Sequence, residues 1–323
     1  MNQLSKEAVN WLEVSADEAG QRIDNFLTRW LKGVPKSHLY RILRSGEVRV
    51  NKGRIGPDYR VMGGDRIRVP PIRVAKKTPL TSPHPSQLVD FDILFEDASI
   101  LVINKPSGLA VHGGSGISLG AIEQLRLSRP QAKFLELVHR LDRDTSGILM
   151  FAKKRSALVA LHEQLRLGQV KKIYLTLVQG RWTDAKRSVK LSLQKHLLAN
   201  GERRVSVDEQ GQPSHTIFRL KQSWLEHIPP MALLEAELKT GRTHQIRVHL
   251  SHLGYPIIGD DKYGDFELNK KWQKKKCKRM FLHASHAQVV HPESGEKLTF
   301  DAPLPKELTL MLQILSSPHV PTI

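Results

Sequence analysis

The stretch LVHRLDRDTSG, from Leu137 to Gly147, places one carboxylate between two guanidinium groups. Asp142 has Arg140 on one side and Arg143 on the other. The ordinary pKa of an aspartate is about 3.9, and neighbouring guanidinium groups lower it. A carboxylate in this setting stays ionised at neutral pH, which makes it a poor general acid but a competent nucleophile or electrostatic stabiliser. A structural ion pair explains the same residues at least as well, so the local sequence leaves both interpretations open.

The elements around this stretch suit a side chain that is presented to a cleft. The segments FLELVHRL at 134–141 and GILMFAK at 147–153 are apolar enough to form strands on either side of it. A Thr-Ser-Gly turn lies between the acidic residues and the second strand. Loops at strand ends on a rigid scaffold often carry functional groups, so this position favours the functional interpretation.

Two segments could be taken for a cofactor-binding loop and a metal site, but neither has the required residue order. The segment HGGSGISLG at 112–120 is rich in glycine, but it lacks the residue order of the phosphate-binding loop and of the dinucleotide-binding loop, so we interpret it as a flexible turn. The segment RTHQIRVHLSHLG at 242–254 contains His244, His249 and His252 without the spacing of a zinc-binding helix, and its arginines would repel a divalent cation. We interpret these histidines as surface or phosphate-facing groups and predict neither a cofactor nor a metal.

A serine or cysteine nucleophile is also poorly supported. Cys277, the single cysteine, has no accompanying pattern of base and orienting group. One cysteine also excludes a disulfide within the chain and a zinc site built on cysteines, which indicates a reducing compartment.

The composition indicates a globular protein with a polyanionic partner. Of the 323 residues, 40% are hydrophobic and 25% are charged, and the formal net charge is +18. An excess of this size favours nucleic acid as the partner, with a basic cytosolic protein that lacks such a partner as the alternative. The N-terminal sequence has no secretory pattern, and no stretch approaches the roughly 18 apolar residues of a membrane span. We therefore expect a cytoplasmic protein with no membrane partner.

The positive charge is concentrated near the N-terminus. Residues 20–77 contain 15 Lys and Arg residues against 4 Asp and Glu residues. We expect this module to bind phosphates through basic side chains. The residues predicted to contact RNA are Lys36, Arg41, Arg44, Arg49 and Lys52.

Two domains are predicted from the change in pattern along the chain. The apolar periodicity of QRIDNFLTRWL at 21–31 and of PKSHLYRILRSG at 35–46 predicts two short helices, and short strands follow them. We assign this α/β module to residues 1–77, with its core at 20–77. The proline-rich segment at 78–88 is predicted to be a linker, and residues 89–323 form the second domain.

In the second domain, predicted strands outnumber helices and tight turns join many of them. This pattern favours a mostly antiparallel α+β domain. The further segments that carry this prediction are a hairpin at 92–106, a helix at 155–168, strands at 171–180 and 231–238, a helix at 242–254, a hairpin around Ser294-Gly295 and a helix at 305–315.

The segment KKWQKKKCKR at 270–279 has seven Lys and Arg residues and no acidic residue. It fits either a solvated loop or an added RNA contact through Lys274 and Lys275. Trp272 favours the RNA contact, because an aromatic side chain can stack on a base.

Four blocks of the chain, in order, resemble the family of RluA-type pseudouridine synthases. They are NKPSGLAVHGG at 104–114, HRLDRDTSG at 139–147, KKIYLTLVQG at 171–180 and TGRTHQIRVHLSHLGYPIIGD at 240–260. The N-terminal module resembles the S4-type RNA-binding domain that many members carry. The resemblance implies a catalytic domain of pseudouridine synthase type, with a mixed, mostly antiparallel β-sheet and flanking helices. The stretches DEAGQRIDNFL and GVPKS are similar to members that act on large-subunit ribosomal RNA.

The resemblance implies an isomerase that converts specific uridines of large-subunit (23S) ribosomal RNA to pseudouridine without a cofactor. By the same resemblance Asp142 is the catalytic carboxylate, for which attack on the ribose, attack on the base and promotion of a glycal are three open roles. Arg247 matches the basic partner of that carboxylate. Tyr174 matches a tyrosine that stacks on the uracil and can shuttle a proton, and Arg140 matches a residue that fills the gap left by the flipped base.

Two other functions are compatible with the same residues. One is a non-catalytic RNA-binding or ribosome-assembly factor on the same scaffold, which the activity of an Asp142 variant would distinguish. The other is a metal-dependent RNA hydrolase, which sensitivity to chelators would distinguish. We expect a monomer whose partner is ribosomal RNA.

Overall fold

The computed structural model describes residues 8–31, 34–72, 89–113, 119–197, 202–275 and 277–317. The chain divides into two units, Met1–Leu88 and Val89–Ile323, and each has its own hydrophobic core. The linker predicted at 78–88 lies outside the described residues, and so do residues 114–118 of the glycine-rich segment.

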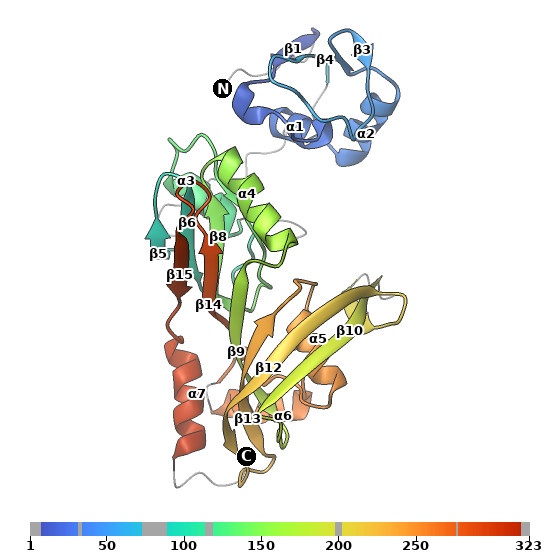
Figure 1. The fold of residues 1–323 in the computed structure, drawn as a ribbon. Helices are drawn as coiled ribbons and strands as arrows, with labels where there is room; N and C mark the ends of the chain where they lie inside the picture. The colour runs from blue at the N-terminus through green and yellow to red at the C-terminus, as the bar shows by residue number, and fades with distance from the viewer. Residues whose placement is uncertain are drawn as a thin grey trace. The chain divides into compact units, whose positions relative to one another are not determined.

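The N-terminal unit is a four-stranded antiparallel sheet with both helices on one side of it (Figure 1). The strands lie in the order β1-β4-β2-β3. The elements are β1 (Asn10–Glu13), the 3-10 helix η1 (Ala16–Glu18), α1 (Ile23–Trp30), α2 (Lys36–Arg44), β2 (Arg49–Val50), β3 (Gly53–Arg54) and β4 (Arg66–Val69). This is the small α/β module that the sequence predicts.

The apolar spacing of the two helices explains their position on the sheet. Ile23, Phe26 and Leu27 of α1 are fully buried, and Ile42 of α2 lies in the same core. A helix with one apolar stripe must cover that stripe, and the inner face of the sheet does so. Gly46 has a φ of +72° and follows the end of α2, in the left-handed conformation that glycine adopts without a Cβ clash.

The C-terminal unit is built on an eleven-stranded sheet, in the order β11-β10-β12-β13-β9-β14-β8-β6-β5, with β15 paired to β14 and β7 to β8. The strands are β5 (Asp92–Glu96), β6 (Ile100–Lys105), β7 (Glu136–Leu137), β8 (Ser146–Ala152), β9 (Lys171–Gln179), β10 (Lys186–Leu197), β11 (Arg203–Val207), β12 (Gln212–Trp224), β13 (Met231–Leu238), β14 (Leu282–Val290) and β15 (Lys297–Asp301). The helices are α3 (Ala121–Ser128), α4 (Arg155–Arg166), α5 (Gln245–His252), α6 (Phe266–Lys274) and α7 (Lys306–Ser316).

Antiparallel pairing dominates this sheet, with one parallel contact between β14 and β8. Every residue of β8 is buried, which explains why its sequence is almost continuously apolar. Helix α4 packs its inner side, Leu158 and Leu161, on residues of β8 and β14 (Figure 1). The predicted fold class, a mixed and mostly antiparallel sheet with flanking helices behind an S4-like module, is confirmed.

Several local predictions are wrong. The strand predicted at 134–141 pairs only at Glu136–Leu137. Residues 270–274 belong to α6 rather than to a solvated loop, and Trp272 is fully buried in the core, so its ring cannot stack on a base. Strands β10, β11 and β12 are additional to the prediction. Strands β10 and β12 mix buried, partly buried and exposed positions, and four of the twelve residues of β10 are Lys or Arg, which weakens the apolar signal.

Candidate active site

A tight turn presents the Asp142 side chain. The Thr145 N–H donates to the Asp142 carbonyl over 3.2 Å, and aspartate is favoured at the first position of such a turn. Strand β8 begins directly after the turn, at Ser146, so the turn is attached to an interior strand of the sheet, between β14 and β6. The carboxylate lines a cleft of about 1460 Å³, which exceeds the roughly 300–1,000 Å³ usual for small-molecule pockets and suits a larger substrate.

The charged partner of Asp142 comes from a distant part of the chain. Nη1 of Arg247 on α5 lies 3.3 Å from Oδ2 of Asp142. Arg143 instead pairs with Asp144, at 3.2 Å from Nε to Oδ1. The interpretation that both flanking guanidinium groups hold Asp142 is therefore wrong: among the described residues neither Arg140 nor Arg143 forms an ion pair with it, because the turn directs neighbouring side chains differently.

A second carboxylate fixes the Arg247 guanidinium. Its Nε and Nη2 each donate to Asp260 over 2.7 Å, and both side chains are almost fully buried, at 3% and 1% exposed. Burial alone would lower the pKa of Arg247, but the hydrogen bonds and charge of Asp260, and the charge of Asp142, raise it overall. A bidentate pair leaves the remaining N–H groups in a defined direction. Arg247 therefore presents a permanent, oriented positive charge to Asp142.

Asp260 is itself held by the backbone that follows it. The N–H groups of Lys262 and Tyr263 donate to its Oδ1 over 2.8 and 3.0 Å. Burial would raise the pKa of Asp260, but these bonds and the Arg247 guanidinium lower it overall. Asp260 is the last residue of the block 240–260, and no role was predicted for it. Its position in that block was the only indication in the sequence that it belongs to the site.

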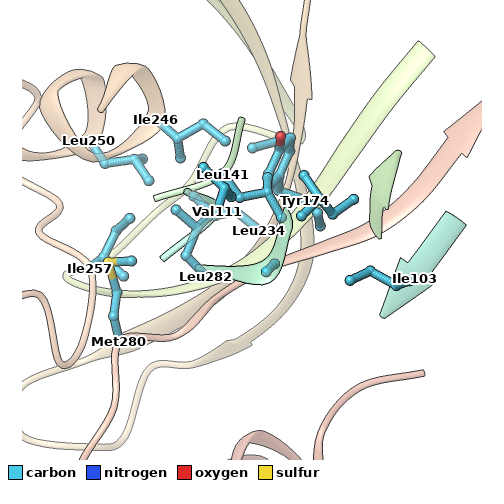
Figure 2. Close-up of a cluster of buried hydrophobic side chains, with 14 of the residues drawn as sticks. Ile103, Val111, Leu141, Tyr174, Leu234, Ile246, Leu250, Ile257, Met280 and Leu282 are labelled. Carbon is cyan, nitrogen blue, oxygen red and sulfur yellow. The ribbon is translucent and has the colours of Figure 1, made fainter. Parts of the chain in front are cut away.

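Tyr174 forms part of the apolar wall beneath the carboxylate. Its position on β9 lies opposite Ala236 of β13 and Ala284 of β14, and these two small residues leave room for the ring. Figure 2 shows the ring within a cluster that includes Leu141 and Ile246, with the hydroxyl oxygen at the edge of the cluster. Burial and the charge of Asp142 raise the pKa of the hydroxyl well above its ordinary value. The phenol therefore keeps its proton at neutral pH.

His244 completes the polar side of the cleft. Its Nε2 lies 3.8 Å from Oδ1 of Asp142, and its Nδ1 lies 2.9 Å from the Tyr263 hydroxyl. Its backbone is left-handed, with a φ of +55°, immediately before α5. Burial lowers its pKa against the opposing charge of Asp142, which favours the neutral ring. The Tyr263 ring also covers the Arg247 guanidinium at 5.2 Å.

Two of the three histidines of this segment are not surface groups, whereas His252 is exposed, as predicted. His244 is partly buried beside Asp142, and His249 is fully buried with its Nε2 at 2.7 Å from the Ser214 hydroxyl. Burial lowers the pKa of His249 to about 4. Helix α5 directs the His249 ring inwards and leaves His252 on the exposed side.

A buried lysine holds the back of the Asp142 turn. Nζ of Lys105, which is fully buried, donates to the carbonyls of Pro106, Leu109 and Arg143 over 2.9, 2.8 and 3.0 Å. The three donors of an ammonium group match these three acceptors. Burial lowers the pKa of Lys105 to about 7. No role was predicted for Lys105, although it lies in the block NKPSGLAVHGG.

Ser107 and a buried polar chain hold the turn from two further sides. The Ser107 hydroxyl donates to the Asp144 carbonyl over 2.7 Å. Arg279 donates to the Ser146 hydroxyl over 2.6 Å, and that hydroxyl lies 2.8 Å from Nδ1 of His283. Burial lowers the pKa of His283 to about 4, so the ring is a neutral member of this chain.

Gly147 allows β8 to lie directly against β14. Its φ is +107°, and a Cβ at this position would lie 2.2 Å from the Ala284 carbonyl oxygen. Any side chain there would push apart the two strands that carry the Asp142 turn and frame Tyr174.

The cleft has a strongly basic lining. Seven Lys and Arg residues line it against two acidic residues, Asp142 and Glu202. The basic residues are Arg140, Arg166, Lys172, Lys195, Arg242, Arg247 and Lys262. Such a surface attracts a polyanion, and cleft walls focus that field.

The predicted site residues fall into three groups. Asp142, Tyr174 and Arg247 meet in the cleft, and the exposed Arg140 lines it. Lys274 and Lys275, at the end of α6, do not line it. The remaining predicted RNA contacts belong to the N-terminal unit, where Arg41, Arg44, Arg49 and Lys52 are exposed. Lys36 begins α2, and its side chain lies outside the described part of the structure.

Within the described ranges, no group of three or more His, Cys, Asp or Glu side chains could hold a metal ion. None of the helices in the described part of the chain is both long and apolar enough to cross a membrane.

Two family models match the chain. The model described as RNA pseudouridylate synthase matches residues 99–252, and that of the S4 domain matches residues 21–67. Close relatives carry the name ribosomal large subunit pseudouridine synthase C. The protein from Haemophilus influenzae is 51% identical over 317 residues, with 97% of each chain covered. The protein from Pasteurella multocida is 53% identical over 323 residues, with 98% of each chain covered.

Solved structures share the fold. Human RNA pseudouridylate synthase domain containing 4 superimposes with a TM-score of 0.54 at 26% identity, over 69% of this chain and 92% of its own. Human RNA pseudouridylate synthase domain containing 1 superimposes with a TM-score of 0.55 at 24% identity, over 74% of this chain and 100% of its own. The chain belongs to the RNA pseudouridylate synthase family, and it is an isomerase with an N-terminal S4 domain.

Proposed function

We propose that this protein isomerises specific uridines of large-subunit ribosomal RNA to pseudouridine, with Asp142 as the catalytic carboxylate. The observation that carries the proposal is the pairing of Asp142 with Arg247 at 3.3 Å, where Arg247 is itself fixed by the buried Asp260. Relatives more than 50% identical over nearly the whole chain bear the name ribosomal large subunit pseudouridine synthase C, which supports the choice of RNA.

The reaction conserves atoms and needs no outside reagent. The bond between N1 of uracil and C1′ of ribose breaks, the base turns over, and a bond between C5 and C1′ forms. C5 loses its proton and N1 gains one. An ionised carboxylate can assist as a nucleophile or by stabilising positive charge on the sugar. The Arg247 guanidinium, 3.3 Å from the Asp142 carboxylate, balances its negative charge.

Tyr174 and Arg140 have separate roles in this proposal. The buried Tyr174 ring provides a surface on which the uracil stacks, and its protonated hydroxyl can relay a proton to or from the base. Arg140 is exposed where it lines the cleft, so it can enter the space that the flipped base leaves. Extraction of a base from its stack costs a few kcal/mol, which phosphate contacts with the basic lining offset.

We further propose that the protein acts as a monomer in the cytoplasm. We propose a monomer because all the residues that line the cleft belong to one C-terminal unit. The compartment rests on the location of ribosomes.

Pseudouridine mapping tests the choice of RNA. Large-subunit ribosomal RNA should be mapped from cells that have the gene, cells that lack it, and cells complemented with wild type or Asp142→Asn. We expect particular pseudouridines to disappear with the gene and to return only with wild type. An unchanged map in large-subunit RNA, together with lost sites in another RNA, would show that the substrate is different.

A further inference from the structure

The outer face of the N-terminal sheet carries one row of aligned side chains. Strand register places Trp11 of β1 opposite Arg68 of β4, Arg68 opposite Arg49 of β2, and Arg49 opposite Arg54 of β3. Side chains opposite one another in adjacent strands project on the same side of a sheet. The row therefore crosses all four strands, with one tryptophan and three arginines.

This face is the one that the helices leave uncovered. Leu12, Val50 and Ile67 alternate with the residues of the row and are buried in the core with α1 and α2. Figure 1 shows both helices on the same side of the strands. Since neighbouring residues in a strand point to opposite faces, the row points away from the helices.

Trp11 is unusually exposed for so large an aromatic side chain, at 53%. The guanidinium of Arg66, diagonal to it on β4, lies over the ring at 5.5 Å from its centroid. This contact orients the indole and leaves its other surface open. By contrast, Trp30 in the same unit packs against Phe26 and the core.

The arginines are positioned without carboxylates. Nη1 of Arg68 donates to the Glu47 carbonyl over 2.9 Å, and Nε of Arg49 donates to the Gly46 carbonyl over 3.4 Å. Arg54 lies against Gly46, where a Cβ would come within 2.9 Å of its Nε. These contacts follow the C-terminal end of α2, whose carbonyls favour cations.

Their charges remain available to a ligand. Across residues 8–31, 34–72 and the rest of the described chain, Arg49, Arg54, Arg66 and Arg68 form no ion pair with a carboxylate. Trp11 and Arg68 also lie outside the residues 21–67 that match the S4 family model.

We propose that this Trp–Arg face, which consists of Trp11, Arg49, Arg54, Arg66 and Arg68, binds an unpaired segment of RNA. One base stacks on the open surface of the Trp11 ring, and the arginines contact the phosphates of the same strand. An aromatic platform beside unpaired cations suits single-stranded RNA, because the base faces of a duplex are covered by their neighbours. The inference rests on the proposed function, since it assumes an RNA substrate with unpaired nucleotides near the modified site.

Binding of short RNAs to the full chain tests the proposal. The probes are a labelled oligouridylate of about 12 nucleotides and an RNA duplex of about the same length. Trp11→Thr removes the ring but keeps a residue that favours strands, and Trp11→Phe keeps an aromatic ring. Met62→Thr, at a residue 65% exposed in the same unit, is the matched control. Thermal melting verifies that each variant is folded.

We expect Trp11→Thr to weaken oligouridylate binding by about tenfold and duplex binding by less than about twofold, while Trp11→Phe stays within about threefold of wild type. Arg54→Gln and Arg66→Gln should each reduce the slope of log affinity against log salt by about 0.7 on the single strand. Oligouridylate affinity that is unchanged in a folded Trp11→Thr protein would overturn the proposal. An equal loss on the duplex would overturn the stacking contact.

This test is independent of turnover. If Trp11 governs oligouridylate affinity but the protein forms no pseudouridine in any RNA, the proposed function fails and the Trp–Arg face stands. If pseudouridine forms normally and Trp11 has no effect on binding, the proposed function stands and the proposed role of the Trp–Arg face fails.

Discussion

Arginines serve opposite purposes in the two units of this protein. In the cleft, Arg247 is 3% exposed and contacts three carboxylates, those of Asp142, Asp260 and Asp261. On the Trp–Arg face, four arginines have backbone contacts or an aromatic neighbour, and none of them forms an ion pair with a carboxylate among the described residues. In the cleft, carboxylates neutralise the positive charge of the arginine. On the Trp–Arg face, the positive charges of the arginines remain available to a ligand.

The difference follows from what each charge has to do. A buried guanidinium that lost its carboxylate would be strongly destabilising, so Arg247 must be fully paired, and the pairing gives it one fixed direction. An exposed guanidinium that grips phosphates gains from release of counterions, and an internal carboxylate would compete with the phosphate. Substitutions should therefore affect the chemical step in one region and affinity in the other.

The largest effect among the groups around Asp142 is expected for Arg247→Met. Asp142 would lose its partner and Asp260 would be left as an unpaired buried charge, which costs about 3–5 kcal/mol of stability. We expect activity to fall by at least about a hundredfold in the fraction that remains folded. Asp261→Asn is the matched control, because that side chain is 60% exposed and should be nearly silent. A fully active Arg247→Met enzyme would contradict the role of Arg247 as the partner of Asp142.

Tyr174→Phe should have the next largest effect. The ring and its packing remain, so RNA affinity and the melting temperature should stay near those of wild type, while loss of the hydroxyl slows turnover by about tenfold or more. Single-turnover kinetics separate the two quantities. Tyr255→Phe removes a different tyrosine hydroxyl, which donates to the Arg181 carbonyl over 3.3 Å at an exposed position, and should leave turnover unchanged. Equal effects of the two substitutions would argue against a specific role for Tyr174.

Lys105→Met should act on stability first. The methionine leaves three carbonyl groups of the loop and turn without their donor, at a cost of about 1–3 kcal/mol for each group that water does not reach. Denaturant melts of both proteins measure the difference, and we expect activity to decline with it because the Asp142 turn is held from this side.

The pH dependence of stability gives Lys105 a distinct signature. Its pKa in the folded protein, about 7, lies below the ordinary lysine value of 10.5, so the unfolded chain binds more protons between these values. The unfolding free energy contributed by this group therefore rises with pH through that window. The unfolding free energy of the wild type should therefore increase more steeply with pH in this window than that of Lys105→Met. Parallel pH curves for the two proteins would contradict it.

The smallest effect is expected for Arg44→Gln in the N-terminal unit. Arg44 is exposed at the end of α2, so its loss should weaken RNA binding uniformly and reduce the salt slope by about 0.9 on a duplex. Turnover at saturating RNA should not change. A lower saturated rate with unaltered affinity would mean that the N-terminal unit contributes to chemistry as well as to binding.

Local patterns predicted the elements that are buried on one side or throughout. The apolar stripe of α1 and the continuous apolar run of β8 each lie where their periodicity indicates. Strand β10 was not predicted, because its partly exposed residues include several lysines and the alternation is weak. Helix α6 had a usable signal in the four-residue spacing of Leu268 and Trp272, but its lysines obscured it.

The site required information that no local pattern contains. Asp142 and Arg247 lie 105 residues apart in sequence, and only the family resemblance indicated that they are partners. The neighbours of Asp142 suggested a different arrangement, in which Arg143 would hold it, whereas the turn directs Arg143 to Asp144. Asp260 and Lys105 act through tertiary contacts with the backbone or with Arg247, so their importance is not visible from composition or spacing.

The central claim, that the Asp142 carboxylate carries the reaction, is tested most directly by Asp142→Asn. Tritium release from RNA labelled at C5 of uridine and RNA affinity should be measured on the same protein samples. Asp144→Asn, two residues away and paired with Arg143, makes the same chemical change as a control. We predict no detectable release from Asp142→Asn with RNA affinity within about twofold of wild type, and a nearly normal rate from Asp144→Asn. Release by Asp142→Asn within about tenfold of the wild-type rate would contradict the claim.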